Sequence, residues 1–400
     1  MLAGLGREAR ALAMTTRPGP SSQPPQALVV CHDSAVIAIR IFVGIAGAVV
    51  ALVTLGSAVR TVVVPRGEQT AIGRATFIAV RRLFDLVADR RLDWEAQDAV
   101  KARFAPTALV VLPLVWAAGV IVGSSGVYWA LGVTPYRDAL VLSGSSLTTL
   151  GFRSSDDLTV LLIAIVQGLV GLGLIALLIS FLPTIYSAFS HRETEVAKLH
   201  LRATDAKGEA TPEAMLIRRH AIADLDALMQ LWTDWENWFV EVEETHTSFP
   251  MLVFFRSPVP ARSWITGAGL ALDAASLYCS TLALPTPPEA QLMIRTGTLS
   301  LRRVCDFFGF DYDPDPGPSD PISIERHEWD AVSDQLAHAG LPVVADRDRA
   351  WRDFAGWRVN YDRPLLSLAA YVDAPPARWS SDRAIAYQRP TVIPRRSGSS

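Results

Sequence analysis

Three long apolar runs constrain this chain more than any other feature of its sequence. They cover about residues 35–59, 106–133 and 158–188. The second and third runs contain no charged side chain, and the first is free of charge from Ile41 to Val59. A helix needs about 20 predominantly apolar residues to cross the hydrocarbon core of a bilayer. We therefore predict an all-α membrane protein with three transmembrane helices in contact with membrane lipid.

The rest of the composition excludes several other classes of protein. The formal net charge is −3, so bulk electrostatics favour no nucleic-acid partner. The cysteines are Cys31, Cys279 and Cys305, which are widely spaced and odd in number. Such cysteines form neither a disulfide framework nor a metal-binding pattern.

A short segment rich in serine and threonine, residues 143–153, lies between the second and third apolar runs. A segment held between two spans in this way can dip into the bilayer and return. Irregular backbone at membrane depth is tolerated only where it is buried in protein or lines a water-filled cavity. In such a cavity, hydroxyl and carbonyl oxygens can replace the hydration shell of an ion.

This segment carries a resemblance to a known family. Thr149-Leu150-Gly151-Phe152 is similar to the Thr-Val-Gly-Tyr core of the potassium-channel selectivity filter, and the stretch from Tyr136 to Phe152 resembles the pore helix that precedes it. The resemblance implies a re-entrant pore loop over 136–153 and passive conduction of a cation, K⁺. The residues that it implies for the ion filter are Thr148, Thr149, Leu150, Gly151 and Phe152. Because one loop cannot surround an ion, we expect the subunits to form a homotetramer.

Arg153 departs from the family pattern, because it replaces the last glycine of the filter. Four guanidinium groups at an outer mouth would repel cations over the screening distance of about 8–10 Å. Asp156 and Asp157 follow closely in the sequence. We expect these acids to pair with Arg153 and partly cancel its charge, and we assign all three residues to the outer mouth.

The distribution of arginine predicts the orientation of the spans. Residues 60–105 are rich in arginine, and basic residues also follow the third run, whereas the filter-like loop has only Arg137 and Arg153. The positive-inside rule therefore places 60–105 and the C-terminal part in the cytoplasm and the loop outside the cell. We predict a multi-pass protein of the cell membrane with its N-terminus outside. Within 60–105 the sequence allows either an amphipathic helix on the membrane surface or a soluble helix packed on the C-terminal domain.

The third run contains residues that favour bending. They are Gly168, Gly171, Gly173 and Pro183. Glycine lets helices approach closely, and proline removes a backbone hydrogen bond. In the channel resemblance this run is the inner helix, which makes a gating hinge one interpretation. Simple packing between spans is the other.

The chain changes to a soluble pattern after the third run, and we predict an all-α cytoplasmic domain over 191–375. Its helices are expected at 212–238, 288–309, 323–339 and 346–371. Residues 263–284 fit either a fourth span or a helix buried in a soluble bundle. In the second case Asp273 needs a partner, for which Arg256 and Arg262 are the candidates. The termini, 1–34 and 376–400, are expected to be disordered.

No motif indicates catalysis. Acids and histidines gather in two places, Glu243, Glu244 and His246, and Glu325, His327 and Glu328. Neither group has the spacing of a metal centre, so we interpret both as solvated faces. We predict no catalytic residues, no metal, no cofactor and no enzyme activity. The alternative to a channel is a non-conducting, membrane-anchored sensor or interaction protein that acts through its helical domain.

Overall fold

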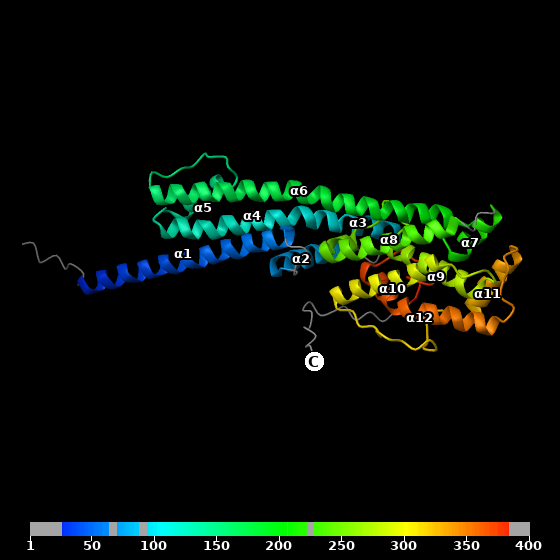
Figure 1. Ribbon diagram of the computed structural model, residues 1–400. Helices are drawn as coiled ribbons and strands as arrows, with labels where there is room; N and C mark the ends of the chain where they lie inside the picture. Colours follow the sequence, from blue (N-terminus) through cyan, green and yellow to red (C-terminus); the bar gives the residue numbers. More distant parts are fainter. Residues whose placement is uncertain (1–25, 64–69, 88–93, 206, 223–226, 384–400) are drawn as a thin grey trace, which may run out of the picture.

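The computed structural model describes residues 26–63, 70–87, 94–205, 207–222 and 227–383 (Figure 1). Within these ranges the chain contains α-helices, one 3₁₀-helix and no β-strand, which confirms the all-α prediction. The elements are α1 (Gln26–Val63), α2 (Ala71–Val87), α3 (Trp94–Ala102), α4 (Phe104–Ala130), α5 (Tyr136–Leu147), α6 (Leu158–Ala203), α7 (Pro212–Ala221), α8 (Ala227–Ser248), the 3₁₀-helix η1 (Pro250–Phe254), α9 (Trp264–Thr281), α10 (Pro288–Phe308), α11 (Arg326–His338) and α12 (Arg347–Val372).

Three of the helices, α1, α4 and α6, are long and apolar enough to span a membrane, as the apolar runs predict. They form an elongated bundle at one end of the molecule, and the short helix α5 packs between α4 and α6 at its far end (Figure 1). Helices α1 and α4 touch through glycines. A Cβ atom on Gly47 would lie 2.4 Å from the carbonyl oxygen of Gly123. Small residues thus let these two backbones approach closely.

Two of the long helices extend beyond the predicted spans. Helix α1 begins at Gln26, earlier than the predicted start at residue 35. Helix α6 continues without interruption to Ala203, although the span was expected to end near residue 188. At about 1.5 Å per residue its 46 residues extend for about 69 Å. The predicted boundary between span and domain therefore falls inside one continuous helix.

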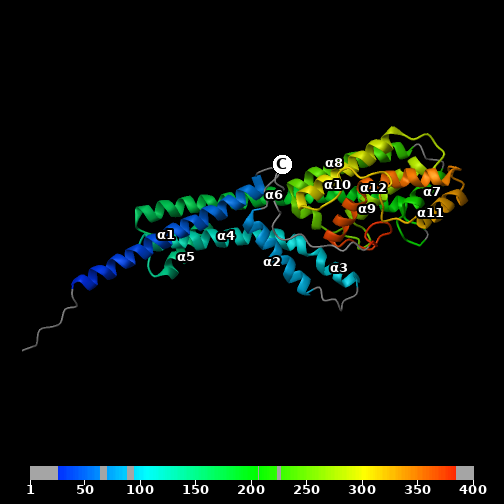
Figure 2. The same cartoon turned by 90° about the horizontal axis from the view of Figure 1, so that it is seen from below.

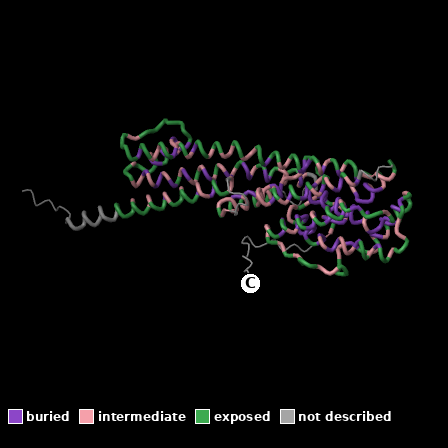
Figure 3. The backbone as a smooth tube through the Cα atoms, viewed as in Figure 1, coloured by how far each residue is buried: buried purple, intermediate pink, exposed green. Residues whose placement is uncertain are grey.

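The C-terminal helices pack around the end of α6 as a separate bundle with its own core. Figure 3 shows buried residues concentrated in this bundle, whereas α1 and the apolar part of α6 are largely exposed. Its largest buried side chains are tryptophans, among them Trp232, Trp235, Trp264 and Trp329. Nearly every residue of α9 is buried within it. Of the two interpretations of 263–284, the structure supports the helix buried in a bundle.

An aromatic cluster joins this bundle to the long helices. The ring centroids of Phe77 on α2 and Phe104 on α4 are 4.6 Å apart, and Phe254 of η1 lies 5.1 Å from Phe77. Figure 2 shows α2 and α3 at the junction of the two parts. The sequence allowed two alternatives for 60–105, and α2 packs on the C-terminal domain as the second of them predicts. Leu83 and Leu86, on the other side of α2, are exposed.

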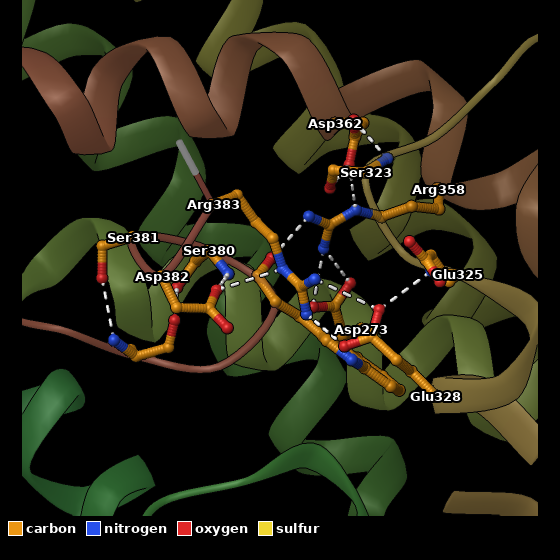
Figure 4. A network of polar contacts seen from close by, with 12 residues as sticks. Asp273, Ser323, Glu325, Glu328, Arg358, Asp362, Ser380, Ser381, Asp382 and Arg383 are labelled. Carbon is orange, nitrogen blue, oxygen red and sulfur yellow. Dashed lines mark hydrogen bonds and ion pairs between the residues drawn. The ribbon is translucent and has the colours of Figure 1, made fainter. Parts of the chain in front are cut away.

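A buried network of charged side chains lies within the C-terminal bundle (Figure 4). Arg358 donates to both carboxylate oxygens of Asp273, at 2.5 and 2.7 Å, and to Asp362 at 2.8 Å. The predicted partners of Asp273, Arg256 and Arg262, were therefore wrong. Arg256 instead pairs with Asp98 of α3. Burial lowers the pKa of Arg358, but its two carboxylate neighbours outweigh burial and raise that pKa above its ordinary value.

The same network corrects two further predictions. Arg358 also donates to the carbonyl of Trp379, which is buried, so residues 376–383 belong to the folded domain and not to a disordered tail. The remainder of that predicted tail, 384–400, and residues 1–25 of the N-terminal tail lie outside the described residues. The single helix expected over 212–238 is two helices, because α7 ends where the N–H of Ile222 bonds to the carbonyl of Arg218.

Candidate functional site

The filter-like stretch begins with α5, which packs against both α4 and α6. Asp138 lies in its first turn, where a carboxylate is favoured by the helix dipole. Ala139 and Leu142 of α5 share an apolar cluster with Tyr128 of α4 and Val160 of α6. These contacts fix the first half of α5 between its two neighbours.

The end of α5 lies well along α6. A Cβ atom on Gly171 would come within 1.9 Å of the carbonyl oxygen of Leu147, so only glycine permits this contact. Gly171 is 13 positions beyond Leu158, the first residue of α6. At about 1.5 Å per residue, α5 therefore reaches about 20 Å along α6. The chain then returns as irregular backbone over 148–157.

Ser145 organises the first part of this return. Its carbonyl oxygen accepts the backbone N–H groups of Leu150, at 3.1 Å, and of Gly151, at 3.4 Å. Its hydroxyl accepts the backbone N–H of Arg153 at 3.1 Å. Ser145 is fully buried, so the filter-like residues are held against α5 from one side.

Thr149 has a strained backbone. Its φ of +58° lies in the left-handed region, as does the φ of +68° at Gly151. Glycine adopts this conformation freely, but for a β-branched residue it is an outlier that costs about 1–2 kcal/mol. Strain of this kind concentrates at functional sites, which directs attention to this turn.

The predicted filter residues lie together on an exposed edge of the chain. Thr148, Thr149 and Gly151 are exposed, and the exposed fractions of Leu150 and Phe152 are 70% and 65%. Helix α6 also carries exposed apolar side chains, among them Leu162, Ile165 and Leu169. Nothing in the part of the chain that the structure describes covers these surfaces.

The residues predicted for an outer mouth have other partners than expected. The guanidinium of Arg153 pairs with Asp138, at 2.8 Å, and not with Asp156 or Asp157. Asp157 instead caps α6 by accepting the backbone N–H of Val160 at 3.0 Å. Asp156 is exposed. Their proximity in the sequence favoured Asp156 and Asp157 as partners of Arg153. Asp157 caps α6 instead, and the carboxylate that pairs with Arg153 is Asp138 in the first turn of α5.

The four residues of the predicted hinge have different surroundings. Gly171 contacts Leu147, and a Cβ atom on Gly168 would lie 3.4 Å from the carbonyl of Ser146, which supports the packing interpretation for both. A Cβ atom on Gly173 would meet nothing within 4 Å. Pro183 is exposed, and α6 continues through it as a helix.

Gln167 is a site residue that the sequence prediction missed. Its side-chain oxygen accepts the hydroxyl of Tyr128 at 2.7 Å, and its amide nitrogen donates to the hydroxyl of Ser143 at 2.8 Å. The signal was present in the sequence, because Gln167 is an amide within an otherwise apolar run, and polar groups in spans mark functional contacts.

The acidic and histidine clusters have structural roles. His246 was expected on a solvated face but is fully buried. Its Nε2 accepts from Arg192 at 3.1 Å, and its Nδ1 donates to the carbonyl of Val242 at 2.8 Å. Burial lowers the pKa of His246 well below its ordinary value, and the Arg192 charge lowers it further. Glu325 and Glu328 form the capping box of α11.

Within the described ranges, no three His, Cys, Asp or Glu side chains are placed to share a metal ion. Comparison with protein-family models, with curated proteins and with solved structures gives no match for this chain. The case for a function therefore depends on the geometry of α4, α5 and α6.

Proposed function

We propose that the protein is a subunit of a potassium-type cation channel, with an ion filter formed by residues 148–152 of each subunit. The observation that carries this proposal is the course of α5. It packs between two helices of spanning length, its C-terminal end lies about 20 Å along α6, and the chain then returns through an exposed, strained turn. In a bilayer this course would place the turn at membrane depth.

The electrostatics of α5 support a cation rather than an anion. The last carbonyl groups of a helix carry roughly half a negative charge, and the C-terminus of α5 is the end that lies deepest along α6. The hydroxyls of Thr148 and Thr149 and the carbonyls of 149–152 would supply the oxygen ligands that replace hydration water.

The exposed edge supports an assembly of several copies. Four loops around one axis would bring Thr149, Leu150, Gly151 and Phe152 of each copy together and cover the apolar side of α6. Helix α1 would face membrane lipid. In this homotetramer, the basic segment 60–105 and the helical domain would lie in the cytoplasm and the outer mouth outside the cell.

Arg153 is compatible with cation entry because it pairs with Asp138 of the same chain. The pair is partly exposed, so its attraction is modest, but four such pairs present no net ring of charge. Arg153→Gly, which restores the glycine of the family pattern, would remove this pair and the bulk of four side chains at the mouth.

Ion flux into liposomes, with K⁺ compared against Na⁺, tests the proposal. We expect K⁺-selective flux for the wild type, and a higher flux for Arg153→Gly. Arg137→Gly is the matched control, since it removes a nearby arginine outside the filter motif. If all three proteins are intact tetramers and none gives ion flux at any voltage or pH, the proposal of conduction is wrong.

A second candidate function is a membrane-anchored sensor or interaction protein without conduction. It is favoured by the size of the helical bundle and by α6, which continues as one helix from its apolar part into that bundle. A chain that remains monomeric or dimeric in mild detergent would support this candidate, because a closed pore needs several loops.

A further inference from the structure

The side-chain amide of Gln167 joins three helices. Its oxygen accepts from Tyr128 of α4, and its nitrogen donates to the hydroxyl and, at 3.2 Å, to the carbonyl of Ser143 on α5. Ser143 passes the chain of hydrogen bonds on to α4 by donating to the carbonyl of Ile121 at 2.9 Å. Every polar group of this network has a partner.

The network is closed off from its surroundings. Tyr128 and Ser143 are fully buried, and Gln167 is 5% exposed. Tyr128 lies in an apolar cluster with Ala139, Leu142 and Val160. A polar group in such a place is costly when it is unpaired. The packing of the three helices that gives every one of these groups a hydrogen bond is therefore strongly preferred over a packing that leaves one of them unpaired.

Two contacts fix the register between α5 and α6. Ser143 and Leu147 are four residues apart on α5, and their partners Gln167 and Gly171 are four residues apart on α6. Residues with this spacing share one face of a helix. The hydrogen bond at one level and the backbone contact at the next therefore determine both the depth and the rotation of α5.

Ser145 carries this register to the filter-like residues. It lies between the two contact points, and its oxygens hold the backbone of Leu150, Gly151 and Arg153. A rotation or shift of α5 would move Ser145 and, with it, the carbonyl groups of the returning segment.

We propose that Gln167 is a positioning residue of the ion filter, and this inference rests on the proposed function. It does not touch the ion. It holds α5 in one register, so that residues 149–152 present their carbonyls at the separation that distinguishes K⁺ from Na⁺.

Gln167→Leu tests this role because it keeps the size of the side chain and removes its hydrogen bonds. The matched control is Ser180→Leu, which places the same residue on an exposed part of α6. In tetramers of equal yield, we expect the K⁺/Na⁺ flux ratio to fall about tenfold in Gln167→Leu, a change equivalent to about 1.4 kcal/mol. The control should keep the wild-type ratio. A wild-type ratio in Gln167→Leu would overturn the proposal.

Amide hydrogen exchange gives a second readout that does not depend on conduction. We expect the amides of Leu150, Gly151 and Arg153 to exchange about tenfold faster in Gln167→Leu than in Ser180→Leu, because their hydrogen bonds to Ser145 open more often. Unchanged exchange would contradict positioning by Gln167. Faster exchange in a protein whose wild type conducts no ion would keep the positioning role and overturn the filter.

Discussion

Each of the two parts of this protein contains a buried polar network, and the two networks differ in their chemistry. Between α4, α5 and α6 the network is neutral, with a phenol, an amide and a hydroxyl. In the helical domain it is ionic, with Arg358 between Asp273 and Asp362 (Figure 4). The neutral network positions one short helix. The ionic network joins α9 and α12 to residues 376–383, which are far apart in the sequence.

The surroundings explain this difference. A buried charge is tolerated only where several partners compensate its desolvation. Arg358 has them, because its three nitrogens donate to two carboxylates and to the carbonyl of Trp379. The partners of Gln167, Tyr128 and Ser143, are uncharged, so no buried charge has to be compensated there. The comparison predicts a large cost for breaking the ionic network and a smaller cost for the neutral one.

The largest expected effect comes from Arg358→Met. It leaves Asp273 and Asp362 buried without their cation, and we expect a loss of about 3–5 kcal/mol in the free energy of unfolding of the domain. Arg349→Met is the matched control, because Arg349 is 72% exposed in its pair with Asp353. Chemical denaturation followed by tryptophan fluorescence measures both. If both variants lost the same free energy of unfolding, the ionic network would make no larger contribution to stability than an exposed ion pair.

Gly171→Ala tests the backbone contact beside the neutral network. The added methyl group would overlap the carbonyl of Leu147, and we expect a loss of about 1–3 kcal/mol. Gly173→Ala is the matched control in the same helix, where the methyl group meets nothing within 4 Å. Alanine there should be neutral or slightly stabilising. Thermal unfolding in detergent compares the two, and a similar loss in both would exclude a specific contact with α5.

Acidification tests a third buried group, His246, which is neutral beside the cation of Arg192. Its pKa is depressed in the folded state, so below about pH 6.5 the unfolded chain binds the proton more readily. Stability should therefore fall as the pH drops below about 6.5, by at most about 1.4 kcal/mol per pH unit from this group.

His246→Gln should flatten this part of the pH profile, since glutamine does not titrate. The matched control is His191→Gln, because His191 is exposed in its pair with Glu241. Unfolding free energies between pH 5 and pH 8, expressed relative to pH 8, provide the measurement. An unchanged slope in His246→Gln would assign the acid sensitivity to other groups.

The smallest expected effect comes from Tyr128→Phe, which removes one donor from the neutral network. The oxygen of Gln167 would lose its partner, at a cost of about 1 kcal/mol. Tyr186→Phe, on the exposed side of α6, is expected to have almost no effect. If the cost of Tyr128→Phe approached that of Arg358→Met, the proposed difference between the networks would be wrong.

Part of the candidate site was predictable from the sequence. Apolar length located the three long helices, and the resemblance located the helix that became α5. The ion partners were not predictable. Asp138 lies 15 residues before Arg153, whereas Asp156 and Asp157 follow Arg153 closely in the sequence. Sequence distance favoured the wrong acids because it contains no information on how the chain turns back.

Local composition was sufficient to identify the three helices that are apolar enough to span a membrane, because length and hydropathy depend only on neighbouring residues. The folded structure was needed to show that α6 continues into the domain, that Arg358 neutralises Asp273, and that Gln167 faces Ser143. These facts depend on which faces of distant helices meet. A buried polar group accepts almost any partner of the right chemistry, and packing alone determines which one lies within hydrogen-bonding distance.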